Sequence, residues 1–161
     1  MNIEIICIGT LKETYLREAV GEYLKRITPY CKTRVTELRE SRLPRDAGAS
    51  EEEAVRRREG EALLSAAKKL NGAYIFALDS RGKQLSSEKF AEKTQKLTLE
   101  GKSTLVFLIG GSLGLPEEVR READKVLSFS EMTFPHQLMR LILLEQLYRA
   151  QKILRGEPYH K

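Results

Sequence analysis

Short apolar runs alternate with longer stretches of helical periodicity along the whole chain. The runs cover residues 3–8, 73–78, 103–109 and 126–129, with a weaker strand pattern at Val35 and Leu38. A run without polar alternation is typical of a strand that is covered on both faces of a parallel sheet. A helical pattern follows each run, so the order is β-α repeated five times. This order predicts an α/β fold with an open, mostly parallel sheet and helices on both faces.

Local signals place the ends of the first two helices. Apolar residues recur at helical spacing from residue 13 to residue 27, just before Pro29. Ser50 and Glu53 match a capping box, which predicts the start of the second helix at Ser50. Two i,i+4 pairs, Glu52 with Arg56 and Glu53 with Arg57, indicate a solvated helix face rather than an RNA contact. The charged segment 39–50, with a proline and a glycine, is expected to be an exposed loop.

Similar signals divide the second half of the chain. Residues 79–82 are expected to break the third strand, and Ser86 or Ser87 to cap a helix that reaches about Leu99. Pro116 opens a short helix as a first-turn proline. Pro135 begins the last helix, which Gly156 ends.

Composition limits the possible classes of protein. A chain of 161 residues with 41% hydrophobic content fits one domain, residues 1–161. The N-terminus lacks a basic segment and reads as a strand rather than a signal peptide, and no run approaches the ~20 apolar residues of a membrane span. We therefore expect a cytoplasmic protein.

The cysteines and the net charge do little to narrow the choice of function. Cys7 and Cys31 are far apart and have no histidine nearby, so both are expected to be buried, and no metal site is expected. The net charge of +5 includes a basic excess between Arg140 and Lys161. This excess is compatible with RNA binding and equally with an ordinary surface.

Three strand ends are candidates for a ligand site: Leu78-Asp79, Gly110-Gly111 and the segment 128–135. The glycine pair would let a ligand approach the backbone, although such a pair is more often only a turn. The chain lacks G-x-G-x-x-G, a P-loop lysine and G-x-S-x-G, which disfavours NAD, ATP and serine hydrolase chemistry. Hydroxyls in 128–135, such as Ser130 and Thr133, could cap the last helix or bind a ligand, and capping is the simpler interpretation.

Four motifs in order carry a family resemblance. They are Phe107-Leu-Ile-Gly-Gly111, Leu127-Ser-Phe-Ser-Glu-Met-Thr-Phe-Pro-His136, Glu145-Gln-Leu-Tyr-Arg-Ala150 and Pro158-Tyr-His-Lys161. Together they closely resemble the ribosomal large subunit pseudouridine methyltransferase family called RlmH, of the SPOUT class of knotted methyltransferases. The resemblance covers the whole length, but leaves the role of the charged loop 39–50 open.

The resemblance implies a C-terminal trefoil knot, a homodimer and the cofactor S-adenosylmethionine. The implied reaction is methylation of N3 of a pseudouridine in 23S rRNA of the assembled ribosome. The cofactor would contact one residue at a strand end, one glycine and one loop: Leu78, Gly111, Ser130, Glu131, Met132, Thr133, Phe134 and Pro135. Arg149, Tyr159 and His160 would form the methyl-acceptor side.

Given the reaction that the resemblance implies, the chemistry of Arg149, Tyr159 and His160 suggests a role for each. A neutral His160 could accept the N3 proton, Arg149 could stabilise the anionic ring or hold a phosphate, and Tyr159 could stack on a base or hold the tail. Without the resemblance, Arg149 would pair with Glu145 and the tail would fray. His136, at a helix start, is expected to be neutral and structural. The alternatives are a non-catalytic RNA-binding module and a methyltransferase for another RNA.

Overall fold

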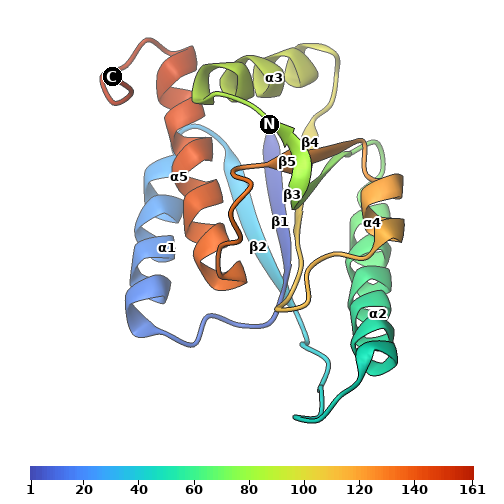
Figure 1. The fold of residues 1–161 in the computed structure, drawn as a ribbon. Coiled ribbons are helices and arrows are strands. Elements are labelled where there is room, and N and C mark those ends of the chain that lie inside the picture. The colour runs from blue at the N-terminus through green and yellow to red at the C-terminus, as the bar shows by residue number, and fades with distance from the viewer.

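A computed structural model describes all residues from Met1 to Lys161 and contains a central five-stranded sheet (Figure 1). The strands are β1 (Asn2–Ile8), β2 (Lys32–Leu38), β3 (Tyr74–Gln84), β4 (Thr104–Ile109) and β5 (Lys125–Ser128). They lie in the order β2-β1-β4-β3-β5, and each neighbouring pair is parallel. The predicted α/β fold with a parallel sheet is confirmed.

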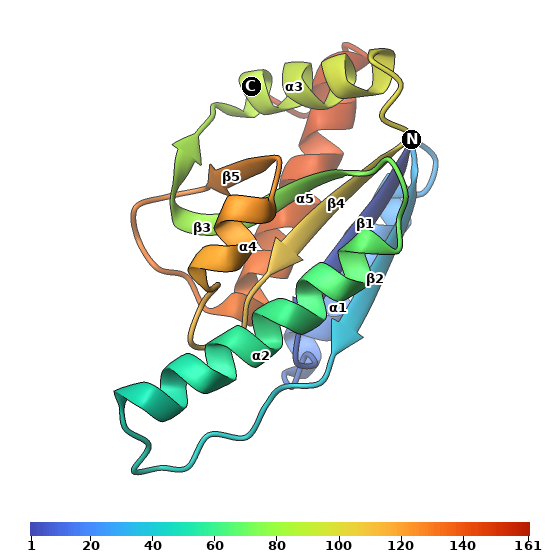
Figure 2. The same cartoon turned by 90° about the vertical axis from the view of Figure 1, so that its right-hand side faces the viewer.

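Five helices cover the sheet, and Figure 2 shows them from the side. They are α1 (Thr14–Ile27), α2 (Ala49–Lys68), α3 (Ser87–Leu99), α4 (Glu117–Glu122) and α5 (His136–Leu154). Helices α1, α3 and α5 pack on one face and α2 and α4 on the other. The C-terminal trefoil knot stays a prediction.

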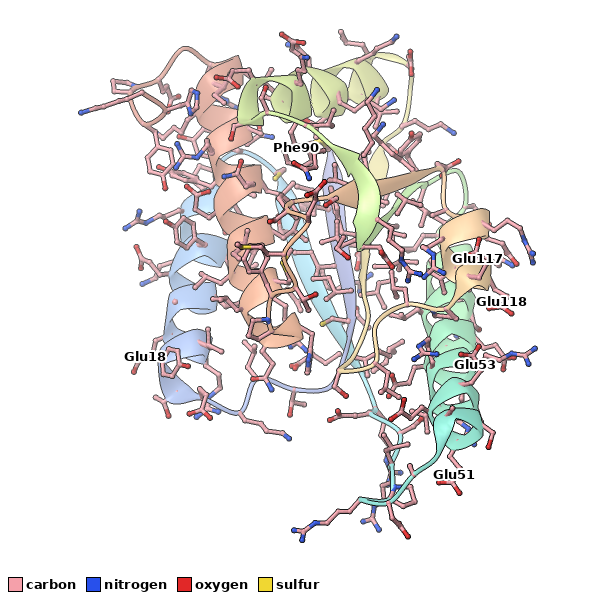
Figure 3. The ribbon with its side chains drawn as sticks, in the orientation of Figure 1. Glu18, Glu51, Glu53, Phe90, Glu117 and Glu118 are labelled. Carbon is pink, nitrogen blue, oxygen red and sulfur yellow. The ribbon has the colours of Figure 1, made fainter.

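Alternation along the central strands divides the core into two layers. Ile5 of β1 and Phe107 of β4 face α1, α3 and α5, whereas Ile6 and Leu108 face α2 and α4. Phe90 of α3, labelled in Figure 3, packs edge-on against Phe107 with ring centroids 6.2 Å apart. The central strands carry apolar side chains on both faces, which explains their unbroken hydrophobic runs.

Both cysteines are buried as predicted, and burial raises the pKa of the Cys7 thiol to about 11. Ser86 caps α3, since its side chain accepts a hydrogen bond from the amide of Lys89 at 3.2 Å. Gly156 follows the last turn of α5 with φ of 63°, the left-handed conformation of a C-terminal cap. These three predictions are confirmed.

The predicted capping box at Ser50 is wrong. Helix α2 begins at Ala49 with Gly48 as the N-cap, and no side chain caps it. The amides of Glu51 and Glu52 both donate to the carbonyl of Gly48 at 3.1 Å. Ser50 is therefore already inside the first turn, where its hydroxyl cannot act as the cap.

The two predicted i,i+4 pairs are also absent from α2. Arg56 pairs with Glu53 and donates from Nε to the carbonyl of Leu113 at 2.9 Å. Arg57 instead lies 3.8 Å from a carboxylate oxygen of Glu118. Both arginines therefore contact α4 or the loop before it, while Glu51, Glu53, Arg57 and Arg58 are exposed, in agreement with the predicted solvated face.

Residues 79–82 were expected to end the third strand, but β3 continues through them to Gln84. Leu127 of β5 is paired with Leu78 and again with Lys83, so the intervening polar residues form a bulge. At Gly82 the two backbones come close, because a methyl group there would lie 2.7 Å from the carbonyl oxygen of Val126. The strand thus continues along β5 while the bulge projects beside the ends of the neighbouring strands.

Candidate functional site

A cavity of about 620 Å³ lies where β4, β5 and the first half of β3 end. Seven of the eight residues predicted to contact a cofactor line it: Leu78, Gly111, Ser130, Met132, Thr133, Phe134 and Pro135. Glu131 is exposed and does not line the cavity. The three strand ends chosen from the sequence therefore do meet at one site.

The glycine turn gives the cavity a wall of main chain. A methyl group on Gly110 would lie 2.8 Å from the backbone of Gly114, and one on Gly111 would lie 2.9 Å from Oε2 of Glu59. The amide of Gly114 closes the turn by donating to the carbonyl of Gly111 at 3.0 Å. Close packing against backbone thus requires a glycine at position 110, whereas a methyl group at position 111 would displace the carboxylate of Glu59.

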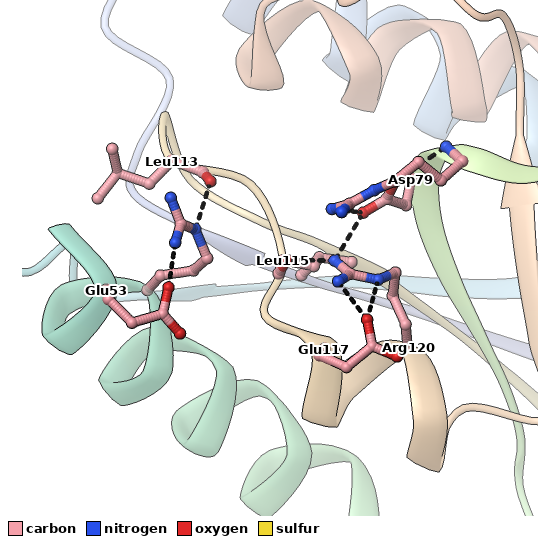
Figure 4. Close-up of polar contacts among 8 residues, drawn as sticks. Glu53, Asp79, Leu113, Leu115, Glu117 and Arg120 are labelled. Carbon is pink, nitrogen blue, oxygen red and sulfur yellow. Dashed lines mark hydrogen bonds and ion pairs between the residues drawn. The ribbon is translucent and has the colours of Figure 1, made fainter. Parts of the chain in front are cut away.

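An ion-pair network around Asp79, drawn in Figure 4, holds another part of the cavity lining. Arg120 donates to Oδ2 of Asp79 at 3.2 Å and to the carbonyl of Leu115 at 2.6 Å. Arg81 also donates to Asp79, at 3.0 Å. Burial raises the pKa of Asp79, but the hydrogen bonds and charges of Arg81 and Arg120 outweigh burial and hold that pKa below its usual value. Asp79 therefore stays ionised and ties the β3 bulge to the loop before α4.

The loop between β5 and α5 is folded by its own hydroxyls. Ser128 Oγ donates to the carbonyl of Ser130 at 2.8 Å, and Ser130 Oγ accepts from the amide of Met132 at 3.0 Å. Helix α5 has Pro135 as its N-cap and no side-chain cap. The simpler interpretation, that these hydroxyls cap α5, is wrong.

His136, the first residue of α5, lines the cavity, and its structural role stays a prediction. Burial, together with the charges of Arg140 and Lys12, lowers the pKa of His136 despite the nearby carboxylate of Glu40. A neutral imidazole therefore faces the cavity, which agrees with the predicted charge state.

The three residues predicted for the acceptor side form a second cluster at the other end of α5. Arg149 Nη1 lies 3.2 Å from Nδ1 of His160, and Nε2 of His160 lies 2.8 Å from a carboxylate oxygen of Glu88 in α3. Arg149 also pairs with Glu145, as its spacing predicts, with Nε 3.0 Å from Oε1.

The tail is anchored rather than frayed. The hydroxyl of Tyr159 donates to Glu145 at 3.0 Å and lies 3.1 Å from that of Tyr23. Its ring packs edge-on against Tyr148, and the Arg149 guanidinium lies 4.8 Å from the ring centroid. Burial and the hydrogen bonds to Tyr23 and Glu145 raise the pKa of Tyr159, so it remains a phenol. In this arrangement Tyr159 holds the tail.

The cavity includes His136 and Met139 at the start of α5, and the tail cluster lies near the end of that helix at Arg149; Figure 1 shows the two ends of α5 and the C-terminal tail beyond the second. Met139, which lines the cavity, and Arg149 are ten residues apart on the helix, about 15 Å at ~1.5 Å per residue. Within one chain the tail cluster therefore does not reach the cavity.

Sequence reasoning missed Arg120 and Glu145, which hold the cavity wall and the tail. Apart from its position after the glycine turn, nothing in the sequence indicated that Arg120 would contact Asp79. Glu145 was named as a partner of Arg149, but its bond to Tyr159 depends on a tail fold that no local pattern specifies.

No group of three or more His, Cys, Asp or Glu side chains is placed to hold a metal ion. None of the helices has the length and apolar character to cross a membrane.

Comparisons with known proteins agree with this geometry. Residues 1–160 match the family described as "Predicted SPOUT methyltransferase". Proteins named ribosomal RNA large subunit methyltransferase H from Alkaliphilus oremlandii, Clostridium novyi and Carboxydothermus hydrogenoformans are each 52% identical over 161 residues, covering both chains completely.

Two solved structures share the fold at low sequence identity. A probable methylase family protein from Haemophilus influenzae is 12% identical with a TM-score of 0.57, over 99% of this chain and 70% of that one. A probable methyltransferase from Bordetella pertussis is 13% identical with a TM-score of 0.54, over 92% and 95%. The chain belongs to the SPOUT methyltransferase family and, within it, to the ribosomal RNA large subunit methyltransferase H family.

Proposed function

We propose that this protein is a homodimeric, S-adenosylmethionine-dependent methyltransferase that methylates N3 of a pseudouridine in 23S rRNA of the assembled ribosome. The observation that carries the proposal is the cavity at the strand ends, which gathers residues from the two motifs at positions 107–111 and 127–136. The names of the relatives support large subunit rRNA as the substrate.

The residues of the cavity fit a nucleoside cofactor. Leu115, Leu127 and Met139 offer apolar surface for a purine ring, and the bare glycine turn and the loop 128–135 offer main-chain polar groups. The volume of about 620 Å³ lies within the range of small-molecule sites. S-adenosylmethionine would supply an activated methyl group, so the chain needs only to orient the acceptor and manage its proton.

His160 is the proposed proton acceptor. Arginine can only donate, so in a neutral His160 the nitrogen Nδ1, which faces Arg149, would carry the lone pair, and Nε2, which faces Glu88, would carry the proton. This neutral tautomer is the form a base requires. To accept the N3 proton, Nδ1 must exchange its contact with Arg149 for one with the pyrimidine, which leaves the guanidinium beside the anionic ring.

A second subunit would bring the two parts together. Since the tail cluster of one chain lies at the far end of α5 from its own cavity, we propose that each tail completes the cavity of the partner. Apolar side chains on α5 are only partly buried, including Leu138, Leu141 and Ile142, and nearby Met132 is 75% exposed. These surfaces are suited to a dimer interface.

Two measurements test the proposal. Isothermal titration should show micromolar binding of S-adenosylmethionine, whereas no binding would favour a non-catalytic RNA-binding module. Mass spectrometry of 23S rRNA should detect a methylpseudouridine in cells that have the gene and not in cells that lack it. If the modification persists without the gene, or appears in tRNA instead, the assignment is wrong.

A further inference from the structure

The segment between β2 and α2, residues 39–48, projects beyond the end of the sheet (Figures 1 and 2). We call this segment the arm. Its arginines are Arg39, Arg42 and Arg45, and all three are exposed. Their only acidic neighbours within the arm are Glu40 and Asp46. The arm is the part of the chain for which the family motifs suggest no role.

Most arginines of this protein have an intramolecular partner. Ten of the fifteen contact a carboxylate, a carbonyl oxygen or an aromatic ring, for example Arg34 with Glu4 at 2.8 Å. The other five are Arg39, Arg42, Arg45, Arg58 and Arg121. Four of these five belong to the arm or to the facing turn of α2. Unpaired guanidinium groups are thus concentrated in one place.

These side chains surround a hollow of about 450 Å³. Arg39, Arg42 and Arg58 line it together with Ser41, Glu40 and Glu59. The two acids do not neutralise the arginines directly. The side chain of Glu40 turns toward Gly9, and its Oε2 lies 3.6 Å from the position that a β-carbon on Gly9 would occupy. Glu59 is 4% exposed and accepts the amide hydrogen bond of Ser41 at 3.0 Å.

Glu59 also joins the hollow to the cofactor cavity. One carboxylate oxygen holds the base of the arm through Ser41, and the other lies against Gly111 in the glycine turn. A polyanion in the hollow would therefore lie on the far side of the glycine turn from the cavity. This placement suits the backbone of a nucleic acid whose target base enters the cavity.

We propose that the arm and Arg58 form a binding site for the RNA phosphate backbone next to the methyl-transfer site. The inference rests on the proposed function, because it assumes that the substrate is RNA. Guanidinium groups form bidentate hydrogen bonds with phosphate, and an exposed, unpaired arginine retains all its donors for this contact. Such contacts position an RNA without reading its sequence.

The test compares two triple variants that remove the same charge. The arm variant carries Arg39→Gln, Arg42→Gln and Arg45→Gln. The control carries Lys32→Gln, Lys69→Gln and Arg121→Gln, three exposed residues outside the arm. For each, the affinity for purified bacterial 70S ribosomes is measured from 50 to 300 mM salt, beside the affinity for S-adenosylmethionine and the urea midpoint.

The arm variant should bind ribosomes at least about tenfold more weakly than the control, and its plot of log affinity against log salt should be shallower by about two units. Cofactor affinity and stability should match the wild type. A variant with lysine at the same three positions restores the charge but not the bidentate hydrogen bonds, so it should recover the salt slope and part of the affinity, which excludes misfolding as the cause.

Three results would overturn the inference. The first is equal ribosome affinity in the arm and control variants. The second is a loss of affinity without a change in salt slope, which would indicate a ribosomal protein as the partner. The third is a lysine variant whose ribosome affinity is no higher than that of the glutamine variant. Failure of the proposed function is seen separately, because wild-type protein would then neither bind the cofactor nor methylate 23S rRNA.

Discussion

Arg140 Nη2 donates to the carbonyl oxygen of Gly9 at 2.7 Å from a helix position that is 1% exposed. The same nitrogen donates to the carbonyl of Ile8 at 3.0 Å, and Nη1 pairs with Glu37 at 2.8 Å. This one guanidinium joins the N-terminal part of α5 to the ends of β1 and β2. It thereby fixes the start of the helix that borders the cavity.

Replacing Arg140 with leucine should destabilise the protein. Two buried carbonyl oxygens would lose their donor, which is expected to cost at least about 2 kcal/mol. Urea denaturation at neutral pH measures the change. Arg26→Leu is the matched control, because Arg26 pairs with Glu22 on the exposed surface of α1 and its loss should change the midpoint little. Equal midpoints for the two variants would contradict this role for Arg140.

The sequence did contain a signal for Arg140, since it interrupts the run Leu138-Met139-Arg140-Leu141-Ile142. A charge inside such a run is either a surface break or a buried, paired group. Local pattern cannot choose between the two. The choice depends on Gly9 and Glu37, more than one hundred residues away.

Gly110→Ala should weaken cofactor binding. The added methyl group would lie 2.8 Å from the backbone carbon of Gly114, and backbone cannot move aside as a flexible side chain can. The turn must therefore open, and we expect at least tenfold weaker binding of S-adenosylmethionine in isothermal titration, about 1.4 kcal/mol. Gly48→Ala is the control, because nothing lies within 4 Å of the added methyl group. Unchanged affinity in Gly110→Ala would show that the turn does not shape the site.

Glu59→Gln should stabilise the protein at neutral pH. Burial raises the pKa of Glu59, although the hydrogen bond from Ser41 opposes this shift. A carboxyl with a raised folded pKa costs stability above that pKa, and the cost disappears as pH falls to the unfolded value near 4.5. Glutamine can still accept the Ser41 amide. The urea midpoint of the variant should exceed that of the wild type at pH 7 and equal it at pH 4. A constant difference across this range would exclude titration of Glu59 as the cause.

Strand and helix order could be read from the sequence because each β-α unit carries its own apolar run. The order β2-β1-β4-β3-β5 could not, since the central strands are apolar on both faces and offer no preference among parallel neighbours. The bulge after Leu78 was missed because polar residues and Gly82 are also typical of a loop. The cavity was found because carboxyl ends of parallel strands share an edge. The anchored tail was not found from local pattern, because Tyr23, Glu88 and Tyr159 are distant in sequence.

His160→Ala should reduce methylation while leaving cofactor binding intact. Loss of a general base typically slows the chemical step by about 100-fold or more. Single-turnover methylation of 70S ribosomes measures this step, and isothermal titration measures binding. Lys161→Ala, one residue further along, is the control. A rate equal to that of the control would assign the proton to solvent.

A mixture of two impaired variants tests whether the tail acts on the partner subunit. One variant lacks residues 159–161. The other carries Gly110→Ala and is assayed well below the wild-type dissociation constant for S-adenosylmethionine, where tenfold weaker binding leaves about one tenth of the wild-type rate or less. Each homodimer therefore has both of its sites impaired. Random exchange makes half of the dimers mixed, and in each mixed dimer the intact tail of one subunit meets the intact cavity of the other at one of two sites.

Activity should therefore return to about one quarter of the wild-type rate after subunits are unfolded and refolded together. If the tail instead acted on its own cavity, both sites of a mixed dimer would remain incomplete, and mixing would restore nothing. A second mixture, of the tail-deleted variant with a Gly110→Ala chain that also carries His160→Ala, should not exceed the rates of the unmixed variants. In that mixture the only intact cavity faces a tail that lacks the His160 imidazole. If activity were still restored, His160 would not be needed for methyl transfer.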